Sequence, residues 1–297
     1  MKSKAWTEKF MQGVFLVAAC ASVLAVALIC IFLFANGIPA IGEIGFVKFI
    51  TGDIWRPNNN LYGIFPMIIG SLYVTAGAII FGVPIGIFTS VFMAMYCPKH
   101  IYKPLKAATE LLAGIPSVVY GFFGLVVVVP LIREFGRTLK SLGLVDRAGD
   151  GNSILTTSLI LGMMILPTII GTTESAMRAV PAHYYEGSLA LGATKERSIF
   201  RVIIPAAKSG VIAGIVLGIG RAIGETMAVI MIVGNQPRLT ASILQGIRTL
   251  TGNIVLEMGY ATGLHREALI ATGVVLFVFI LIINFSVALL KRGADHE

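Results

Sequence analysis

Six apolar stretches, each about as long as a membrane-spanning helix, constrain this chain more than any other feature of its sequence. A spanning helix needs about 20 mostly apolar residues, and it must satisfy its own backbone hydrogen bonds because lipid offers none. The period-two alternation that a membrane β-barrel requires is absent from the stretches. The sequence therefore predicts an all-α membrane protein with six transmembrane helices, centred near Ala21, Gly82, Tyr120, Met163, Gly218 and Phe277.

The composition excludes an ordinary soluble domain. Hydrophobic residues make up 56% of the 297 residues and charged residues 13%, whereas soluble domains have about 25% charged residues. We expect a single transmembrane domain over 1–297, with a first span at 10–35 and a five-span core at 66–290. The first stretch is longer than the apolar region of a secretory signal, about 7 to 15 residues, so it is interpreted as a retained anchor.

The net charge of +8 would suit nucleic-acid binding, but the basic residues are distributed around the spans, which is the topology signal of membrane proteins. An inside N-terminus and six spans place both termini in the cytoplasm. The loop 133–152 carries basic residues on the outer side, where its amphipathic pattern predicts an interfacial helix; an anion-attracting funnel is the alternative. The inside groups are Lys99, Lys103 and Lys106, then Lys195, Arg197 and Arg201, and finally Lys291 and Arg292.

No motif for catalysis or metal binding is found. Cys20, Cys30 and Cys97 have neither paired spacing nor clustered histidines. The phosphate-binding loop GxxxxGK[ST], the HExxH metal motif and the GxSxG nucleophile elbow are all absent from the sequence. We therefore expect no catalytic site and no metal site, and any energy from ATP has to arrive through a partner.

The polar segment from His183 to Pro205 has the pattern of two short helices joined by a turn. Gly192 can end the first helix in a left-handed conformation, and Thr194 can cap the second by accepting a backbone N–H. Pro205 is expected to mark the start of the next span. The segment 183–204 is predicted to be a cytoplasmic element that presents a surface instead of crossing lipid.

Arg221 and Glu225 stand near the middle of the fifth stretch, where a four-residue spacing would place them on one helix face. An ionised arginine at mid-bilayer costs about 2.5 to 3.5 kcal/mol, so it should face the bundle interior or a water-filled path. The two residues are either a mutually neutralised structural pair or a positive site for an anion whose binding Glu225 weakens enough for release.

The segment from Arg248 to Leu269 after the fifth stretch is rich in hydroxyl groups and charges. It can be a re-entrant or interfacial hairpin whose polar side chains satisfy non-helical backbone, or a surface that receives a substrate or a docking protein. His265 alone does not indicate a metal site.

Three motifs together resemble those of the phosphate-specific ABC importer permeases, in particular the PstC-type subunit. They are ELLAGIPSVVYGFFG in the third span, GRAIGETMAVIMIVGN in the fifth, and TLTGNIVLEMGYATGLHREAL after it. The segment 183–205 resembles the loop by which such permeases dock into a cytoplasmic ATPase, with Glu186, Gly187 and Ser188 where the family has Glu-Ala-Ala. The likeness covers most of the chain from about Trp55 onward.

The resemblance implies a type I ABC importer permease fold with cytoplasmic coupling helices, in a bacterial or archaeal plasma membrane. It implies that Arg221 and Glu225 belong to the phosphate path, and that ATPase docking involves Glu186, Gly187, Ser188, Leu191, Gly192 and Ala193. The implied partners are a PstA-type second permease, a PstB-type ATPase dimer, a PstS-type phosphate-binding protein, inorganic phosphate and membrane lipid. This chain would bind no cofactor, since ATP and Mg are used by the ATPase.

Three alternatives stay open. Permeases for molybdate, sulfate or phosphonate have a similar build and are excluded only by motif likeness. An ion-coupled secondary carrier would use Glu225 as its proton site, although no inverted repeat is visible by eye. A sensor or scaffold would bind phosphate without net uptake.

Overall fold

The structure is a computed structural model that describes the backbone of residues 2–294 and the side chains of residues 8–285. It is almost entirely helical. Its helices are α1 (Lys2–Ile44), α2 (Phe46–Thr51), α3 (Phe65–Val91), α4 (Lys99–Gly114), α5 (Ser117–Phe123), α6 (Val129–Ser141), α7 (Ile154–Ala179), α8 (Ala182–Ala190), α9 (Lys195–Ser198), α10 (Ile204–Ala206), α11 (Lys208–Gly224), α12 (Met227–Ile232), α13 (Leu250–Glu257) and α14 (Gly263–Ala294). Between α2 and α3 the chain forms a small antiparallel hairpin of β1 (Trp55–Arg56) and β2 (Leu61–Tyr62) around a 3₁₀ turn at Pro57–Asn59, with Trp55 opposite Tyr62.

Among the residues that the structure describes, five helical stretches are long and apolar enough to cross a membrane. The pair formed by residues 195–206 and 208–224, bent by 71°, makes a sixth when it is counted as one span. The five are Glu8–Ile44, Phe65–Tyr96, Ser117–Ser141, Ile154–Ala179 and Gly263–Phe285. The predicted helical class is confirmed, and the six predicted spans correspond to these five stretches and the bent pair, which bends at Ala207, two residues after Pro205.

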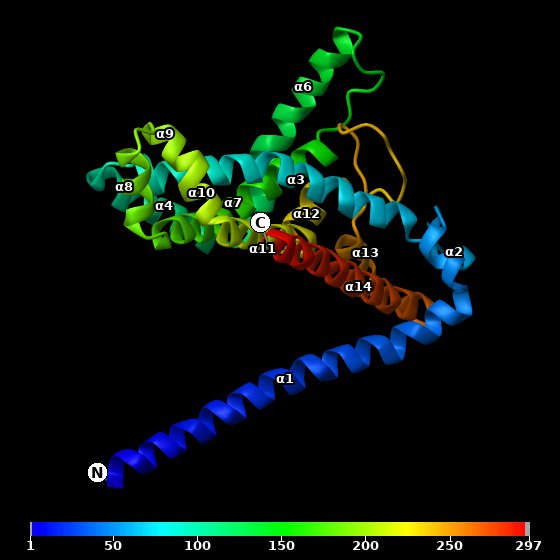
Figure 1. Ribbon diagram of the computed structural model, residues 1–297. Coiled ribbons are helices and arrows are strands. Elements are labelled where there is room, and N and C mark those ends of the chain that lie inside the picture. Colours follow the sequence, from blue (N-terminus) through cyan, green and yellow to red (C-terminus); the bar gives the residue numbers. More distant parts are fainter. Residues whose placement is uncertain (1, 295–297) are drawn as a thin grey trace.

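The first helix, α1, is longer than the predicted span at 10–35 because helical structure continues past the apolar residues at both ends. It runs without a break over 43 residues and extends away from the rest of the molecule as a single arm (Figure 1). Its C-terminal part packs against α14, where Phe34 meets Phe277 edge to face and Gly37 lies against Val274. The apolar side chains along most of α1 are exposed, as expected for a helix surrounded by lipid.

The core is built around α7, which packs along α3 on one side and α11 on the other. Figure 1 shows these helices side by side in the body of the molecule. Small residues allow α3 and α7 to lie close together. A Cβ on Gly82 of α3 would lie 2.7 Å from the Ile165 side chain and 2.9 Å from the Gly162 carbonyl oxygen. In lipid, such close packing is a main source of helix association because the apolar surroundings give no hydrophobic driving force.

Prolines shape the helices in two ways. Pro116 separates two helices: α4 ends at Gly114, and α5 starts at Ser117 after Ile115 and Pro116. Three other prolines each follow a π-helical segment, in which the residue before the proline donates to the carbonyl five residues back. The wider turn makes room for a ring that has no N–H and would clash with an α-helical turn. The segments are Phe92–Tyr96 before Pro98, Gly124–Val128 before Pro130, and Ile199–Ile203 before Pro205.

The segment after residue 133, predicted to be an interfacial helix, is helical as far as Ser141 and is continuous with the third span. α5, the π segment and α6 form one helical stretch from Ser117 to Ser141, and α6 projects from the body at the top of Figure 1. Gly136 packs against the Ala148 carbonyl, which ties the following loop back onto α6.

We predict that Gly82→Ala destabilises the protein by about 2 kcal/mol, because the added methyl group must displace the Gly162 backbone of α7. The matched control is Gly171→Ala on α7 itself, where a Cβ meets nothing within 4 Å and alanine favours the helix by up to about 1 kcal/mol. Thermal unfolding of the detergent-purified chain measures both. Equal unfolding midpoints for the two variants would contradict the packing assigned to Gly82.

Candidate functional site

The segment between α7 and α11 folds as the predicted helix-turn-helix. α8 ends in a Schellman motif: Gly192, with φ at +83°, donates to the Leu189 carbonyl, and Ala193 donates to the Ser188 carbonyl. Thr194 then caps α9 by accepting the Arg197 N–H at 3.3 Å. We call residues 182–203 the docking element.

The docking element has one face anchored in the protein and one face open. Ile199 and Ile203 are buried in an apolar cluster with Val91 of α3 and Met177 of α7. The hydroxyls of Ser188 and Ser198 lie 2.9 Å apart and join α8 to α9. On the open face Leu191 is 91% exposed, at the tip of the turn. Tyr184, Leu189 and Phe200 of the same element are exposed as well, and several exposed apolar side chains on one short element indicate a surface that a partner covers.

The other residues predicted to dock lie around this tip. Glu186 and Gly187 are exposed on α8, as is Gly192 in the turn. Ser188 and Ala193 are half-buried at the junction of α8 and α9. The structure therefore brings all six together on one short element, at the end of the molecule where α4 also lies (Figure 1).

The fifth span is not one continuous helix at Arg221 and Glu225. α11 ends at Gly224, and Glu225 has an extended backbone with φ at −68° and ψ at 131°. Its carboxylate accepts the N–H groups of Thr226 and Ala228, at 3.1 Å each, in the first turn of α12. The expectation that a four-residue spacing puts the two charges on one helix face is therefore wrong.

The reason is that the Glu225 carboxylate binds nearby backbone N–H groups and not the Arg221 side chain. Glu225 caps the start of a new helix, which satisfies N–H groups that a helix break would otherwise leave without partners inside the membrane. Over the described residues, no ion pair joins Arg221 to Glu225. Both side chains are half-buried, and Ala222, next to Arg221, packs in one cluster with Tyr120 of α5. Arg221 thus stands on α11 and Glu225 in the break before α12, not on one continuous helix.

A buried carboxylate that the sequence did not predict lies close to the docking element. Glu174 on α7 is 1% exposed and accepts hydrogen bonds from Tyr102, Lys106 and Arg178 at 2.6, 2.9 and 2.7 Å. The i,i+4 spacing of Glu174 and Arg178 could have suggested their ion pair, but nothing local shows that α4 lies across them.

A second buried carboxylate lies at the opposite end of the molecule, in the polar segment after the fifth span. Glu257 accepts hydrogen bonds from the Trp55 indole at 2.8 Å and from Arg248, and its carboxylate lies 2.9 Å from His265 Nε2. Arg248 also donates to the Asn253 side chain and the Asn235 carbonyl. The network fastens the hairpin to α13 and α14, so these polar side chains hold irregular backbone in place.

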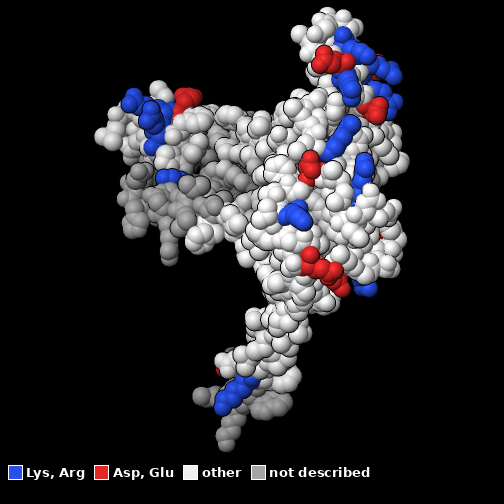
Figure 2. Space-filling model, turned by 90° about the vertical axis from the view of Figure 1, so that its right-hand side faces the viewer, with Lys and Arg blue, Asp and Glu red and all other residues white. Residues whose placement is uncertain are grey.

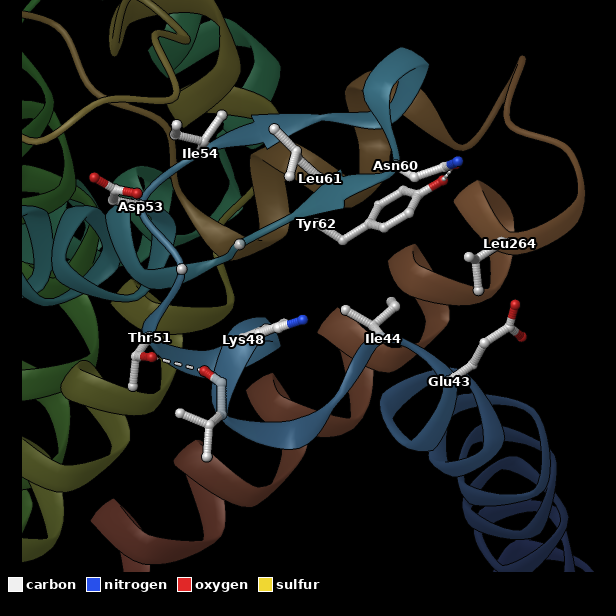
Figure 3. Close-up of a pocket in the computed structure, with 13 residues that line it drawn as sticks. Glu43, Ile44, Lys48, Thr51, Asp53, Ile54, Asn60, Leu61, Tyr62 and Leu264 are labelled. Atoms are coloured by element: carbon white, nitrogen blue, oxygen red, sulfur yellow. Dashed lines mark hydrogen bonds between the residues drawn. The ribbon is translucent and has the colours of Figure 1, made fainter.

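A groove of about 570 Å³ lies beside this network, between α2 and the hairpin. In Figure 3 the Lys48 amine extends into the opening below Tyr62, whose hydroxyl faces Asn60. None of the residues that line the groove is a histidine or cysteine, and no group of three or more potential metal ligands is found among the described residues. We assign no chemistry to this groove.

Figure 2 views the same end of the molecule. Basic side chains gather over the projecting tip at the top, formed by α6 and the loop after it, with acidic side chains among them. The basic residues of this region are Arg133, Arg137, Lys140 and Arg147.

The comparison with protein families identifies one match. Residues 82–296 match the family described as binding-protein-dependent transport system inner membrane component. This range starts inside α3 and includes the docking element, both residues of the broken span and α14.

Relatives with similar sequences match over most of their length. A probable ABC transporter permease protein of Bacillus subtilis is 38% identical, with 92% of this chain and 89% of the relative covered. A phosphate transport system permease protein PstC of Mesorhizobium japonicum is 36% identical, with 86% and 81% covered. A probable phosphate transport system permease protein PstC of Methanocaldococcus jannaschii is 32% identical, with 89% and 88% covered.

Two solved structures share the fold. The permease chain of a bacterial ABC transporter that imports the polysaccharide alginate is 16% identical with a TM-score of 0.58, covering 96% of this chain and 98% of that one. An inward-facing methionine ABC transporter matches at 18% identity and a TM-score of 0.58, covering 81% and 99%. At this identity the likeness concerns the fold alone, that of ABC importer permeases.

The Glu257 network predicts a specific loss of stability in acid. Burial by itself would raise the pKa of Glu257, but the hydrogen bonds from Trp55, His265 and Arg248 and the charge of Arg248 outweigh it and lower the pKa below its ordinary 4.5. The stabilisation is therefore complete above pH 4.5 and is lost as the pH falls through the lower folded-state pKa.

We predict that Glu257→Gln lowers stability at neutral pH by about 3 kcal/mol, because it leaves Arg248 without its anion. The variant should also lose less stability than the wild type between pH 4.5 and stronger acid. Thermal unfolding midpoints measured against pH test both effects. Glu134→Gln, which removes an exposed ion pair on α6, is the control. If the unfolding midpoint fell as steeply below pH 4.5 in Glu257→Gln as in the wild type, the result would contradict the role assigned to the network.

Proposed function

This chain belongs to the family of binding-protein-dependent transport system inner membrane components, and we propose that it is a permease subunit of an ATP-driven importer of inorganic phosphate. The substrate is proposed from the two PstC relatives, which are 36% and 32% identical over most of both chains. The observation that carries the transport mechanism is the exposed Leu191 on a rigid turn that is anchored to α3 and α7 by Ile199 and Ile203.

In the proposed complex, this chain and a homologous second permease form the path, and neither hydrolyses ATP. An ATPase dimer binds ATP and Mg in the cytoplasm and receives the docking element in a surface cleft. An external binding protein delivers phosphate at the opposite end of the molecule. This arrangement places both termini in the cytoplasm, in keeping with the positive residues near 99–106 and 195–201.

The geometry supports alternating access. The docking element shares an apolar cluster with the ends of α3 and α7. Movement of the ATPase would therefore be transmitted to these two helices through packed side chains. A coupled transporter needs different contacts in its inward-facing and outward-facing states. The break between α11 and α12 allows Arg221 and Glu225 to change their separation, which provides such a difference at the proposed phosphate path.

The charge balance in this path suits release as well as binding. The Arg221 guanidinium attracts an oxyanion, and its attraction is strong in the low dielectric of a membrane. Transport requires that the ion leave again, so binding must stay weak. A nearby Glu225 carboxylate, already engaged with the start of α12, offsets part of the positive potential.

Reconstitution of the whole complex tests the proposal. With ATPase, second permease and binding protein in vesicles, we expect phosphate uptake that requires ATP, and sulfate, molybdate and phosphonate should compete poorly. Uptake by the two permeases under an ion gradient without the ATPase would identify a secondary carrier instead. Uptake of another oxyanion in preference to phosphate would overturn the substrate assignment, and phosphate binding without net uptake would indicate a sensor.

We predict that Arg221→Gln reduces phosphate uptake by at least tenfold, or about 1.4 kcal/mol, while the complex still assembles. The substitution removes the positive charge of Arg221, whereas we expect the end of α11 to stay folded. Uptake and co-purification of the subunits are measured together, with Arg238→Gln, an exposed loop arginine, as the control. Loss of the assembled complex in Arg221→Gln would favour a structural role for this residue.

We predict that Gly192→Val uncouples ATP hydrolysis from phosphate uptake. A β-branched residue is strained at a φ of +83°, and because a Cβ there meets nothing within 4 Å, the effect arises from the backbone and not from a clash. Gly143→Val, which makes the same change at a φ of +70° with open space around its Cβ, in the turn after α6, should leave coupling intact. The ratio of phosphate transported to ATP hydrolysed measures coupling, and a normal ratio in Gly192→Val would refute this role of the turn.

A further inference from the structure

The Glu174 carboxylate gathers donors from two helices. On α4, Tyr102 and Lys106 are one turn apart; on α7, Glu174 and Arg178 are one turn apart. Oε1 of Glu174 accepts from Tyr102 and from Arg178, and Oε2 accepts from Lys106. We call these four residues the Glu174 hub. A carboxylate buried to this degree is held by all its partners together, because losing one leaves charge uncompensated in a low dielectric.

The hub also reaches a third element. The Arg178 guanidinium lies 4.4 Å from the centre of the Tyr102 ring, and its Nη2 donates to the Met93 carbonyl at 2.8 Å. Met93 belongs to the π segment that ends the second span. One side chain therefore joins the ends of the second span, α4 and α7.

The hub adjoins the anchor of the docking element. Met177, which stands between Glu174 and Arg178 on α7, is 2% exposed and packs in the cluster that contains Ile199 and Ile203. Only Val180 and Pro181 separate the end of α7 from the start of α8. A displacement of the docking element thus reaches the hub through direct packing and through two residues of chain.

At its far end, α4 leads to the broken span. The chain breaks at Ile115 and Pro116 and resumes as α5. The Tyr120 hydroxyl on α5 donates to the Leu112 carbonyl of α4 at 2.9 Å, across the break. Tyr120 also packs in the apolar cluster that contains Ala222, the residue after Arg221. α4 is held at one end by the hub and at the other by a residue of the cluster that α11 shares.

Between these two points α4 has no buried anchor. None of its residues is buried in this chain, so its position depends on partly exposed contacts with α7 and on the polar contacts of the hub. Lys106 and Arg178 are 30% and 45% exposed in their side chains, which leaves both cations room to follow a shift of the helix.

We propose that Glu174 is a positioning residue that fastens α4 to α7, so that movement of the docking element turns α4 about its break at Pro116 and, through the Tyr120–Leu112 hydrogen bond, shifts Tyr120 within the cluster that contains Ala222 of α11. The inference rests on the proposed function, because it assigns the hub to the coupling of ATP hydrolysis to transport. It extends that function by assigning to α4 the transmission of the movement, and to the hub the attachment of α4 to α7.

A purely structural hub makes a different prediction. It would lower stability and assembly when weakened, but every complex that did assemble would transport the normal amount of phosphate per ATP. Coupling per ATP in the assembled complex is therefore the readout that distinguishes a positioning role from a structural one.

The test uses the complete complex in vesicles with three variants of graded severity. Tyr102→Phe removes one hydrogen bond and keeps the ring under Arg178, Lys106→Met removes one charge and keeps the length of the side chain, and Glu174→Gln removes the shared anion. The matched control is Glu134→Gln, which makes the same change at an exposed ion pair on α6. ATP hydrolysis stimulated by the binding protein, phosphate uptake and subunit stoichiometry are measured on each preparation.

We expect Tyr102→Phe and Lys106→Met to assemble and hydrolyse ATP but to transport at least about threefold less phosphate per ATP, within the range of effects seen for residues on coupled elements. Lys106→Arg, which restores the cation, should recover most of the ratio. An unchanged ratio in both mild variants would overturn the proposal, as would a fall in uptake that follows lost assembly alone.

Failure of the two proposals can be told apart in the same experiment. If the wild-type complex does not transport phosphate with ATP, the proposed function fails. If the wild type transports normally and the mild hub variants keep its coupling ratio, only the role of the hub fails.

Discussion

The structure depends on one constraint: a backbone that breaks its helical pattern within a membrane protein must find other hydrogen-bond partners. Two kinds of adjustment meet this constraint at particular points in the chain. Ahead of Pro98, Pro130 and Pro205, each of which lacks an N–H, a π segment widens the helical turn. Where α11 ends at Gly224, the Glu225 carboxylate takes up N–H groups of α12. The breaks are also the points at which the helices can change direction, so the same places serve stability and movement.

Two buried glutamates organise the two ends of the molecule by the same principle. Glu174 collects a phenol, an ammonium and a guanidinium near the docking element, and Glu257 collects an indole, a guanidinium and an imidazole near the hairpin. Each joins segments that are far apart in sequence. Between the two, the core is formed by the close packing of α7 against α3 and α11.

The docking element was predictable in detail because its determinants are local. Gly192 adopts the left-handed conformation and Thr194 caps the next helix, since a glycine and a hydroxyl at these spacings satisfy nearby backbone groups without any distant contact. The relation of Arg221 to Glu225 was not predictable in this way. A four-residue spacing implies one face only if the helix continues, and whether it continues depends on the Glu225 carboxylate and on the approach of α13, where Thr251 donates to the Glu225 carbonyl.

The sequence by itself determined the class of the protein, the number of spans, the docking element and the family resemblance, because apolar run length, turn residues and motifs are properties of short stretches of chain. Only the tertiary structure decided which charges meet. Lys106 reaches Glu174 across 68 positions and Trp55 reaches Glu257 across 202, and the cost of burying a carboxylate is met by whichever donors the packed helices bring to it. That pairing is a property of the assembled helices, and no local pattern in the chain records it.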